Sequence, residues 1–196
     1  MNEDGKNMLN LFKELKEVNG KISLLLQDIE AHMKKEGWEA DDSTVMSDTS
    51  ASVYSPEKWF PCFLFRFYKN TKRKNILAYV SVLLDDDIYG HYNIVDEPLI
   101  TAGYFEYDKS KDIGEDWIYE YSKWFGYTEN HKINGKIKPY KNWKDDFGKI
   151  FKLKYEKVYE QIENWECFGL PLTSIANSQD IKTKIVTPLL NILSEK

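Results

Sequence analysis

The sequence predicts an α+β fold: a three-stranded antiparallel meander sheet flanked by amphipathic helices, with a small extra hairpin. Three observations support this fold: an apolar stripe at helical spacing over residues 8–33, three consecutive strand-like segments over residues 59–107, and further helical stripes in the C-terminal half. Spacings of three and four mark a helix face, whereas short alternating or continuous apolar runs mark strands. We expect a helix over 1–38, a polar flexible linker over 39–58 and an α+β domain over 59–196.

The first expected element is a helix whose apolar residues recur at alternating spacings of three and four from Met8 to Met33. Asn19-Gly20 interrupts the stripe and predicts a break or kink, because glycine inside a helix costs about 1 kcal/mol relative to alanine. Gly37 follows the last periodic residue and predicts the helix end. The breadth of the stripe favours packing on the protein's own sheet, and a dimerising coiled coil is the alternative.

Three strands are expected next, over 59–68, 76–84 and 99–107. Apolar residues occupy both faces of these strands, which predicts a sheet that is covered on both sides. Pro61 predicts an edge position or the start of pairing for the first strand. The basic segment 69–74 is expected to join the first two strands as a hairpin loop.

The elements expected after the sheet are helical apart from one tight turn. Apolar stripes over 117–125 and 143–165 predict two amphipathic helices, the second of which ends at Gly169. Asn134-Gly135 predicts a type I′ hairpin, because this dipeptide accepts the positive φ that the turn requires. A last helix is expected near the C-terminus, kinked or restarted at Thr187-Pro188.

The composition predicts a globular protein of the cytoplasm that does not bind duplex nucleic acid. The chain has 196 residues, of which 42% are hydrophobic and 30% charged, and its formal net charge is −5. A duplex-binding footprint requires a dense basic face, which the charge distribution does not indicate. The N-terminus lacks the pattern of a signal peptide, and no run of about 18 apolar residues predicts a membrane span.

Sequence motifs for nucleophilic, zinc-dependent or phosphate-binding catalysis do not occur in the chain. We therefore expect a non-catalytic protein-interaction or regulatory module without a cofactor or metal, for which a homodimer through the first helix is one form of association. The residues expected to contact a partner lie on the helix stripe and on the basic hairpin: Leu11, Leu15, Ile22, Lys69, Lys72, Arg73 and Lys74.

Two charged residues, Arg66 and Glu106, interrupt otherwise apolar strand faces. We expect both to reach solvent from the strand ends. One alternative is a cross-strand ion pair between them. Another is a pocket in which Arg66, Tyr79 and Tyr104 recognise an anionic ligand through the guanidinium group.

An acidic cluster supports a second class of function, metal-dependent hydrolysis. Asp85, Asp86 and Asp87 end the second strand, and Glu106 lies near the end of the third. A helix, a three-stranded meander and a further helix, with acids on the second and third strands, resembles the PD-(D/E)xK nucleases. The resemblance implies a Mg²⁺ or Mn²⁺ ion held by these four carboxylates. Lys109 departs from the family pattern by one residue, and a solvated turn is the alternative for the three aspartates.

Overall fold

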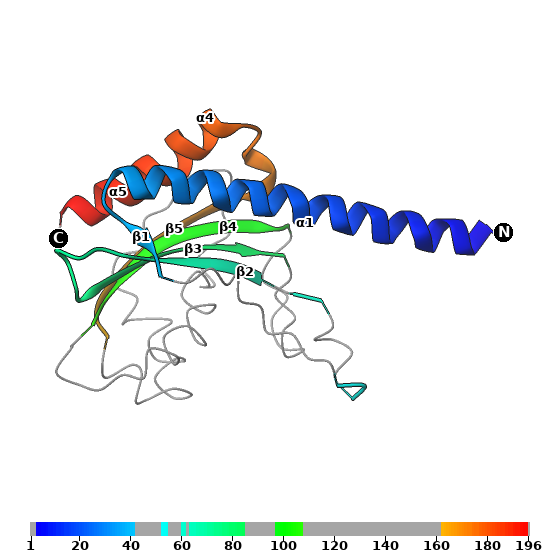
Figure 1. Ribbon diagram of the computed structural model, residues 1–196, viewed down its shortest axis with the longest axis horizontal. Helices are drawn as coiled ribbons and strands as arrows, with labels where there is room; N and C mark the ends of the chain where they lie inside the picture. Colours follow the sequence, from blue (N-terminus) through cyan, green and yellow to red (C-terminus); the bar gives the residue numbers. More distant parts are fainter. Residues whose placement is uncertain are drawn as a thin grey trace.

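The computed structural model describes residues 3–41, 52–54, 60–61, 63–84, 97–107 and 162–195. Within these residues, an antiparallel sheet of five strands is crossed on one face by a long N-terminal helix and a C-terminal helical layer (Figure 1). The predicted α+β class and the meander are confirmed, and the sheet has two strands more than predicted.

The strands of the sheet are β1 (Glu39–Ala40), β2 (Phe63–Lys69), β3 (Ile76–Leu83), β4 (Leu99–Tyr107) and β5 (Ile162–Pro171). They pair in that order, and each is antiparallel to its neighbour. The three predicted strands correspond to β2, β3 and β4, with β4 at the predicted boundaries. Pro61 lies before β2, and the pairing of β2 with β3 starts at Phe63.

The helical elements are α1 (Glu3–Lys35), η3 (Leu172–Ser174), α4 (Ser178–Asp180), η4 (Ile181–Val186) and α5 (Thr187–Ser194). Helix α1 is continuous through Asn19-Gly20, so the predicted break does not occur. Its end is marked by Gly37, which has a φ of 80° and is followed by Trp38, whose N–H donates to the Met33 carbonyl. Among the helices described, none is long and apolar enough to cross a membrane.

The C-terminal helical run contains one widened turn. Asn177 caps its start, because the Asn177 side chain accepts a hydrogen bond from the Asp180 N–H at 3.1 Å. Element η4 is a π-helix, and the Thr187 N–H donates to the Lys182 carbonyl five residues back. Pro188 has no N–H and crowds the preceding turn, which accounts for the wider turn. The kink or restart predicted at Thr187-Pro188 takes this form.

The first layer of the core lies between the helices and one face of the sheet. Helix α1 contributes five buried residues, Ile22, Leu25, Leu26, Ile29 and Met33. They belong to one cluster with apolar residues of the C-terminal layer and with alternate residues of the strands: Ile181, Ile185, Leu189, Leu193, Tyr68, Ala78, Val80, Val82, Ile100 and Phe168. Residues of the predicted segments 1–38 and 59–196 therefore share one core.

The opposite face of the sheet is buried as well. Its aromatic residues form a row across β2, β3 and β4, in which the Tyr79 and Phe105 rings stack with centroids 4.9 Å apart and Phe67 lies 6.4 Å from Tyr79. All three side chains are buried, and both faces of β3 are buried along its length. The prediction of a sheet covered on both sides is confirmed by this burial.

Strand β5 corrects the predicted helix over 143–165 and its end at Gly169. Residues 162–171 form a strand that pairs with β4 from Tyr107 to Leu99, with a register shift after Glu106. Apolar residues at spacings of three and four up to Trp165 predict a helix, and residues 165–170 show no alternation of apolar and polar side chains that would indicate a strand. Pairing along β4 overrides the local helical period. The remainder of that helix, the helix predicted at 117–125 and the Asn134-Gly135 hairpin lie outside the described residues.

Gly20, inside α1, and Gly37, in the turn after α1, predict opposite effects of an added methyl group. At Gly20 an added Cβ meets nothing within 4 Å, so Gly20→Ala is expected to stabilise the protein by about 0.5–1 kcal/mol. At Gly37 the positive φ disfavours any side chain, so Gly37→Ala is expected to destabilise it by about 1 kcal/mol. Urea unfolding of both variants measures the two shifts. Destabilisation by Gly20→Ala would mean that α1 is not helical through that residue.

Candidate interaction surface

The N-terminal half of α1 extends beyond the sheet, and we call residues 3–21 the arm (Figure 1). Ile22 is the first buried residue of α1, so the arm begins where the helix leaves its own core. At 1.5 Å per residue, the arm is about 28 Å long. The structure buries Ile22 at 3% exposure, so this predicted partner contact belongs to the protein's core instead.

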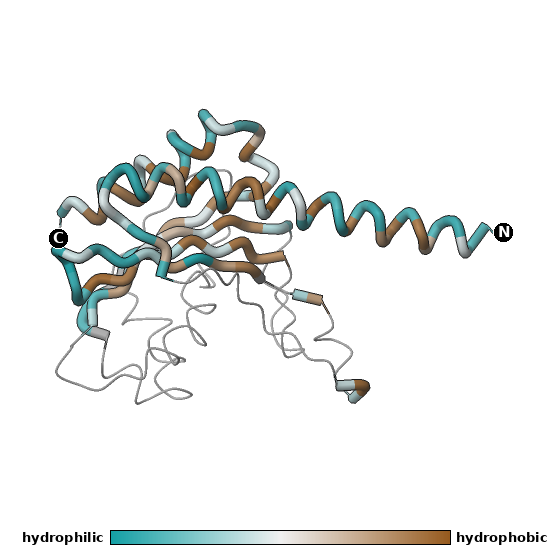
Figure 2. The backbone as a smooth tube through the Cα atoms, viewed as in Figure 1, coloured by the Kyte–Doolittle hydropathy of each residue, from teal (hydrophilic) through white to brown (hydrophobic). Residues whose placement is uncertain are grey.

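The arm carries large apolar side chains that face solvent. Met8 and Leu11 are 63% and 65% exposed, and Leu15 is half-buried. Six of the nine exposed large apolar side chains in the described part of the chain lie on α1: Met8, Leu9, Leu11, Phe12, Val18 and Leu24. The apolar segments recur along the arm in Figure 2. Scattered apolar residues are normal on a surface, but a contiguous stripe marks an interaction site.

The stripe of the arm is a continuation of the stripe that builds the core. Met8, Leu11, Leu15 and Val18 follow one another at spacings of three and four, and the same spacing continues through Ile22 and Leu25 into the buried half. Side chains at these spacings project from one side of a helix. We call these four residues the arm stripe. The arm stripe therefore lies on the same side of α1 as the residues that pack on the sheet from Ile22 onward.

The arm carries balanced charge on its polar surface. Its residues include four acidic and four basic side chains. Glu17 and Lys21 form an ion pair at 2.8 Å, in which both side chains are largely exposed. Lys21 lowers the pKa of Glu17 through this hydrogen bond and its charge. The arm thus has no excess charge that would repel an acidic or a basic partner.

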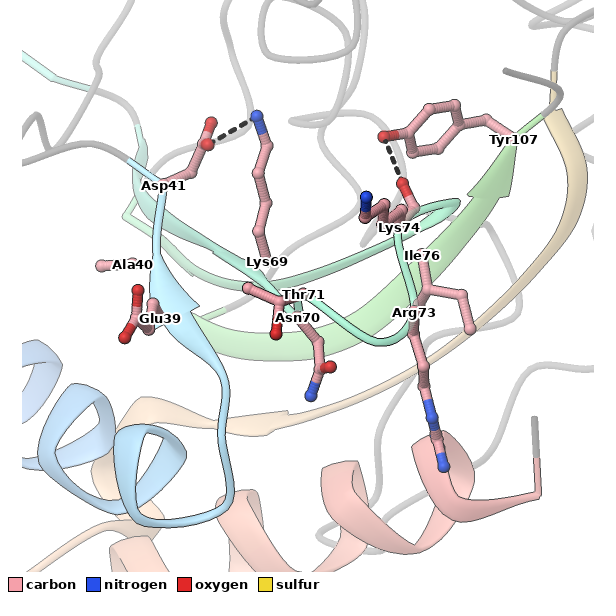
Figure 3. A pocket seen from close by; sticks show the side chains of 10 residues that line it. All are labelled: Glu39, Ala40, Asp41, Lys69, Asn70, Thr71, Arg73, Lys74, Ile76 and Tyr107. Atoms are coloured by element: carbon pink, nitrogen blue, oxygen red, sulfur yellow. Dashed lines mark hydrogen bonds and ion pairs between the residues drawn. The ribbon is translucent and has the colours of Figure 1, made fainter. Parts of the chain in front are cut away.

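The basic hairpin between β2 and β3 borders two hollows. A hollow of about 380 Å³ lies between β1, this hairpin and Tyr107 of β4 (Figure 3). A second of about 470 Å³ lies between the hairpin, the turn after α1 and the end of α5. Glu39 and Asp41 line the first hollow beside Lys69, Arg73 and Lys74, so positive and negative side chains share its wall.

Two of the four basic residues predicted to contact a partner are engaged within the protein. Lys69 pairs with Asp41 at 2.6 Å and so ties β2 to the end of β1. Arg73 points toward α5 in Figure 3 and donates a hydrogen bond to the Leu193 carbonyl near the end of that helix. Lys72 and Lys74 are exposed. The hairpin therefore contacts both the end of β1 and the C-terminal helix α5, and two of its lysines are exposed.

Arg66 lies on the helix-facing side of β2, where it forms an ion pair with Glu30 of α1. Its side chain is 8% exposed, so the expectation that Arg66 reaches solvent is wrong. β3 lies between β2 and β4, so the alternative pair between Arg66 and Glu106 is wrong as well. A buried guanidinium requires a partner because the desolvation of an unpaired charge is costly. An arginine in an otherwise apolar strand face therefore indicates a carboxylate on the helix that covers that face.

The proposed ligand pocket of Arg66, Tyr79 and Tyr104 is not brought together. Arg66 and Tyr104 face the helices, whereas Tyr79 stacks on Phe105 on the opposite face of the sheet. Burial raises the pKa of Tyr104 above its usual range, and the same holds for Tyr68 beside Arg66. Both phenols stay protonated at neutral pH. The Tyr68 hydroxyl is fully buried and finds no hydrogen-bond partner among the described residues.

The acidic cluster is described only in part. Glu106 is half-buried in β4, where one of its oxygens accepts a hydrogen bond from the Asn75 amide at 3.3 Å. Asp85, Asp86 and Asp87 lie outside the described residues, as does Lys109. Within the described part of the chain, no three acidic, histidine or cysteine side chains gather where they could hold a metal ion. The hydrolase hypothesis stays a prediction.

Comparison of the chain with protein-family models, with characterised proteins and with solved structures finds no match to any of them. The interpretation of this surface therefore rests on the residues of the chain itself.

The Arg66–Glu30 pair is expected to contribute far more to stability than the surface pair on the arm. Glu30→Gln removes the negative charge that pairs with the buried Arg66 guanidinium and is expected to cost about 1–2 kcal/mol of unfolding free energy. Glu17→Gln removes the same charge from an exposed pair and should leave the unfolding midpoint unchanged. Urea denaturation compares the two variants. Equal effects would show that Arg66 does not depend on Glu30.

Arg73 is expected to be structural, whereas its neighbour Lys72 is not. Arg73→Ala removes the hydrogen bond to the Leu193 carbonyl and is expected to lower stability by about 1 kcal/mol. Lys72→Ala, in the same loop with an exposed side chain, should have no measurable effect. Thermal unfolding of the two variants at matched concentration makes the comparison. An unchanged Arg73→Ala variant would leave Arg73 available to a partner.

Proposed function

We propose that this chain is a non-catalytic protein-interaction module that binds a partner protein through the arm. The observation that carries the proposal is the continuity of the α1 stripe, because its buried half forms the core and its exposed half repeats the same pattern. An amphipathic helix with a free apolar face is a common recognition element, whose contacts recur every three or four residues.

The energetics favour a covered arm stripe. Each large apolar side chain that a partner buries would contribute about 1.5–3 kcal/mol of favourable free energy. This contribution is absent while the side chain is in water. The arm also contains Gly5, Asn7, Asn10, Asn19 and Gly20, which are weak helix formers. In proteins, most of the stability of a helix comes from packing of its amphipathic face rather than from propensity. A partner that covers the arm stripe would stabilise the helix as well as bury its apolar surface.

Lys72 and Lys74 form a second candidate contact on the exposed side of the hairpin. They belong to the basic segment 69–74, whose other two cations are engaged with Asp41 and Leu193. Two solvent-facing lysines would influence the rate and salt dependence of association more than its strength. The arm is therefore the primary contact in this proposal.

The arm is tested by a charge placed on its stripe and by the same charge placed off it. A tagged chain carrying Leu11→Glu is expected to bind a specific partner at least about tenfold more weakly than the parent does, because a carboxylate would enter an apolar contact. Asn10→Glu, about 120° around the helix from the stripe, should bind as the parent does. Purified partner and isothermal titration then give the affinities.

Equal binding by the stripe variant and the parent would overturn the proposal. Circular dichroism and the melting temperature of each variant check that the domain remains folded. The substitutions lie in the exposed arm, so the core that begins at Ile22 should be unaffected.

A further inference from the structure

We infer that the arm stripe binds a second copy of this chain, in an antiparallel pair of arms. The inference rests on the proposed function and names its partner. Two-fold symmetric dimers are the commonest oligomers, and their interface must be complementary to itself. Three features support a second copy as the partner: the arm stripe, the arm charges and the position of the domain.

The spacing of the stripe is the same in both directions. Met8, Leu11, Leu15 and Val18 are separated by three, four and three residues. A two-fold axis perpendicular to the helix places Met8 beside Val18 of the partner subunit, and Leu11 beside Leu15 of the partner subunit. Phe12 flanks this seam on the arm and is 48% exposed. Each side chain then packs between those of the facing helix, as in an antiparallel coiled coil.

The core determines the direction of pairing. From Ile22 onward, the face that carries the stripe is buried against the sheet and the C-terminal layer. A parallel partner would bring its own domain to this same end, on a face that is already occupied. An antiparallel partner overlaps only along the arm and places the two domains at opposite ends of the pair. In Figure 1, α1 projects far beyond the sheet, and this projection is the length along which two arms would overlap.

The charges of the arm are complementary in the antiparallel direction. Residues 3–12 contain two acidic side chains and one basic side chain, whereas residues 13–21 contain two acidic and three basic ones. Antiparallel pairing places the negative half of each arm beside the positive half of the other. The helix dipoles then also oppose each other. The whole arm is neutral although the chain carries −5, so a second arm meets no net repulsion.

The expected interface is small. Specific complexes bury roughly 1,200–2,000 Å² in total, and two arms about 28 Å long reach only the low end of that range. We therefore expect a reversible dimer with a dissociation constant on the order of micromolar rather than nanomolar. Its population changes across concentrations that are accessible to sedimentation.

Sedimentation equilibrium of the full chain from 1 to about 200 μM tests the inference. The parent is expected to approach a dimer mass, Asn10→Glu to match it, and Leu11→Glu to raise the dissociation constant on the order of 100-fold. A parent that stays monomeric throughout, or a Leu11→Glu variant that dimerises as the parent does, overturns the inference. A monomeric parent whose arm still captures a different protein leaves the proposed function standing. If stripe substitutions alter neither mass nor capture, both proposals fail.

Cysteine cross-linking tests the direction. Mild oxidation of a mixture of Met8→Cys and Val18→Cys chains with different tags is expected to give the mixed disulfide well above the background of the parent, which contains Cys62 and Cys167. Val18→Cys alone should cross-link weakly, because the two sites lie about 15 Å apart along an antiparallel pair. Efficient cross-linking of Val18→Cys with itself overturns the antiparallel arrangement.

Discussion

The burial of one half of α1 against the sheet is the interaction on which the rest of this structure depends. Five apolar side chains of that half enter the core between Ile22 and Met33. At about 1.5–3 kcal/mol each, their burial contributes on the order of 10 kcal/mol before entropy is counted. That contribution is comparable with the net stability of a domain. The same contact brings Glu30 to Arg66 and directs the other half of the helix away from the sheet.

A single helix therefore has two environments, which its sequence does not distinguish. Its apolar residues keep one spacing from Met8 to Met33, yet the domain covers only the part from Ile22 onward. Gly20 and Asn19 lie at the junction, and neither ends the helix. Continuity with a firmly packed segment supplies the nucleus that a free helix would have to form at a cost. The arm can thus be helical in the absence of the contact that its apolar side suggests.

Much of the sheet and one helix could be predicted, because local pattern and tertiary packing agree there. The boundaries of β4 and the start of β3 are as the alternation of apolar residues predicts. Strand β5 could not be recognised in the same way, because its residues fit a helical period until β4 supplies a pairing edge. Two-residue β1 carries no pattern at all, and only its pairing with Lys69 and Tyr68 makes it a strand.

The candidate site was harder to predict than the fold. Leu11 and Leu15 lie on the arm, but Ile22 has the same spacing and the opposite environment. The difference depends on where the sheet ends, which no local pattern encodes. Charge alone makes Arg73 indistinguishable from its lysine neighbours, whereas its contact with Leu193 depends on a helix far along the chain. Such long-range contacts decide which charged groups are structural.

The composition of the core has a consequence for synthesis on the ribosome. Ile22 and Met33 share their cluster with Leu189 and Leu193, so α1 leaves the exit tunnel long before its packing partners in the C-terminal helical layer exist. Contacts between such distant residues form slowly, because closing a long loop opposes them. During that interval both halves of the stripe are exposed together, as a continuous apolar surface of the kind that chaperones retain. The emergence of η4 and α5 completes the layer that, together with the sheet, divides this surface into a core and an exposed arm.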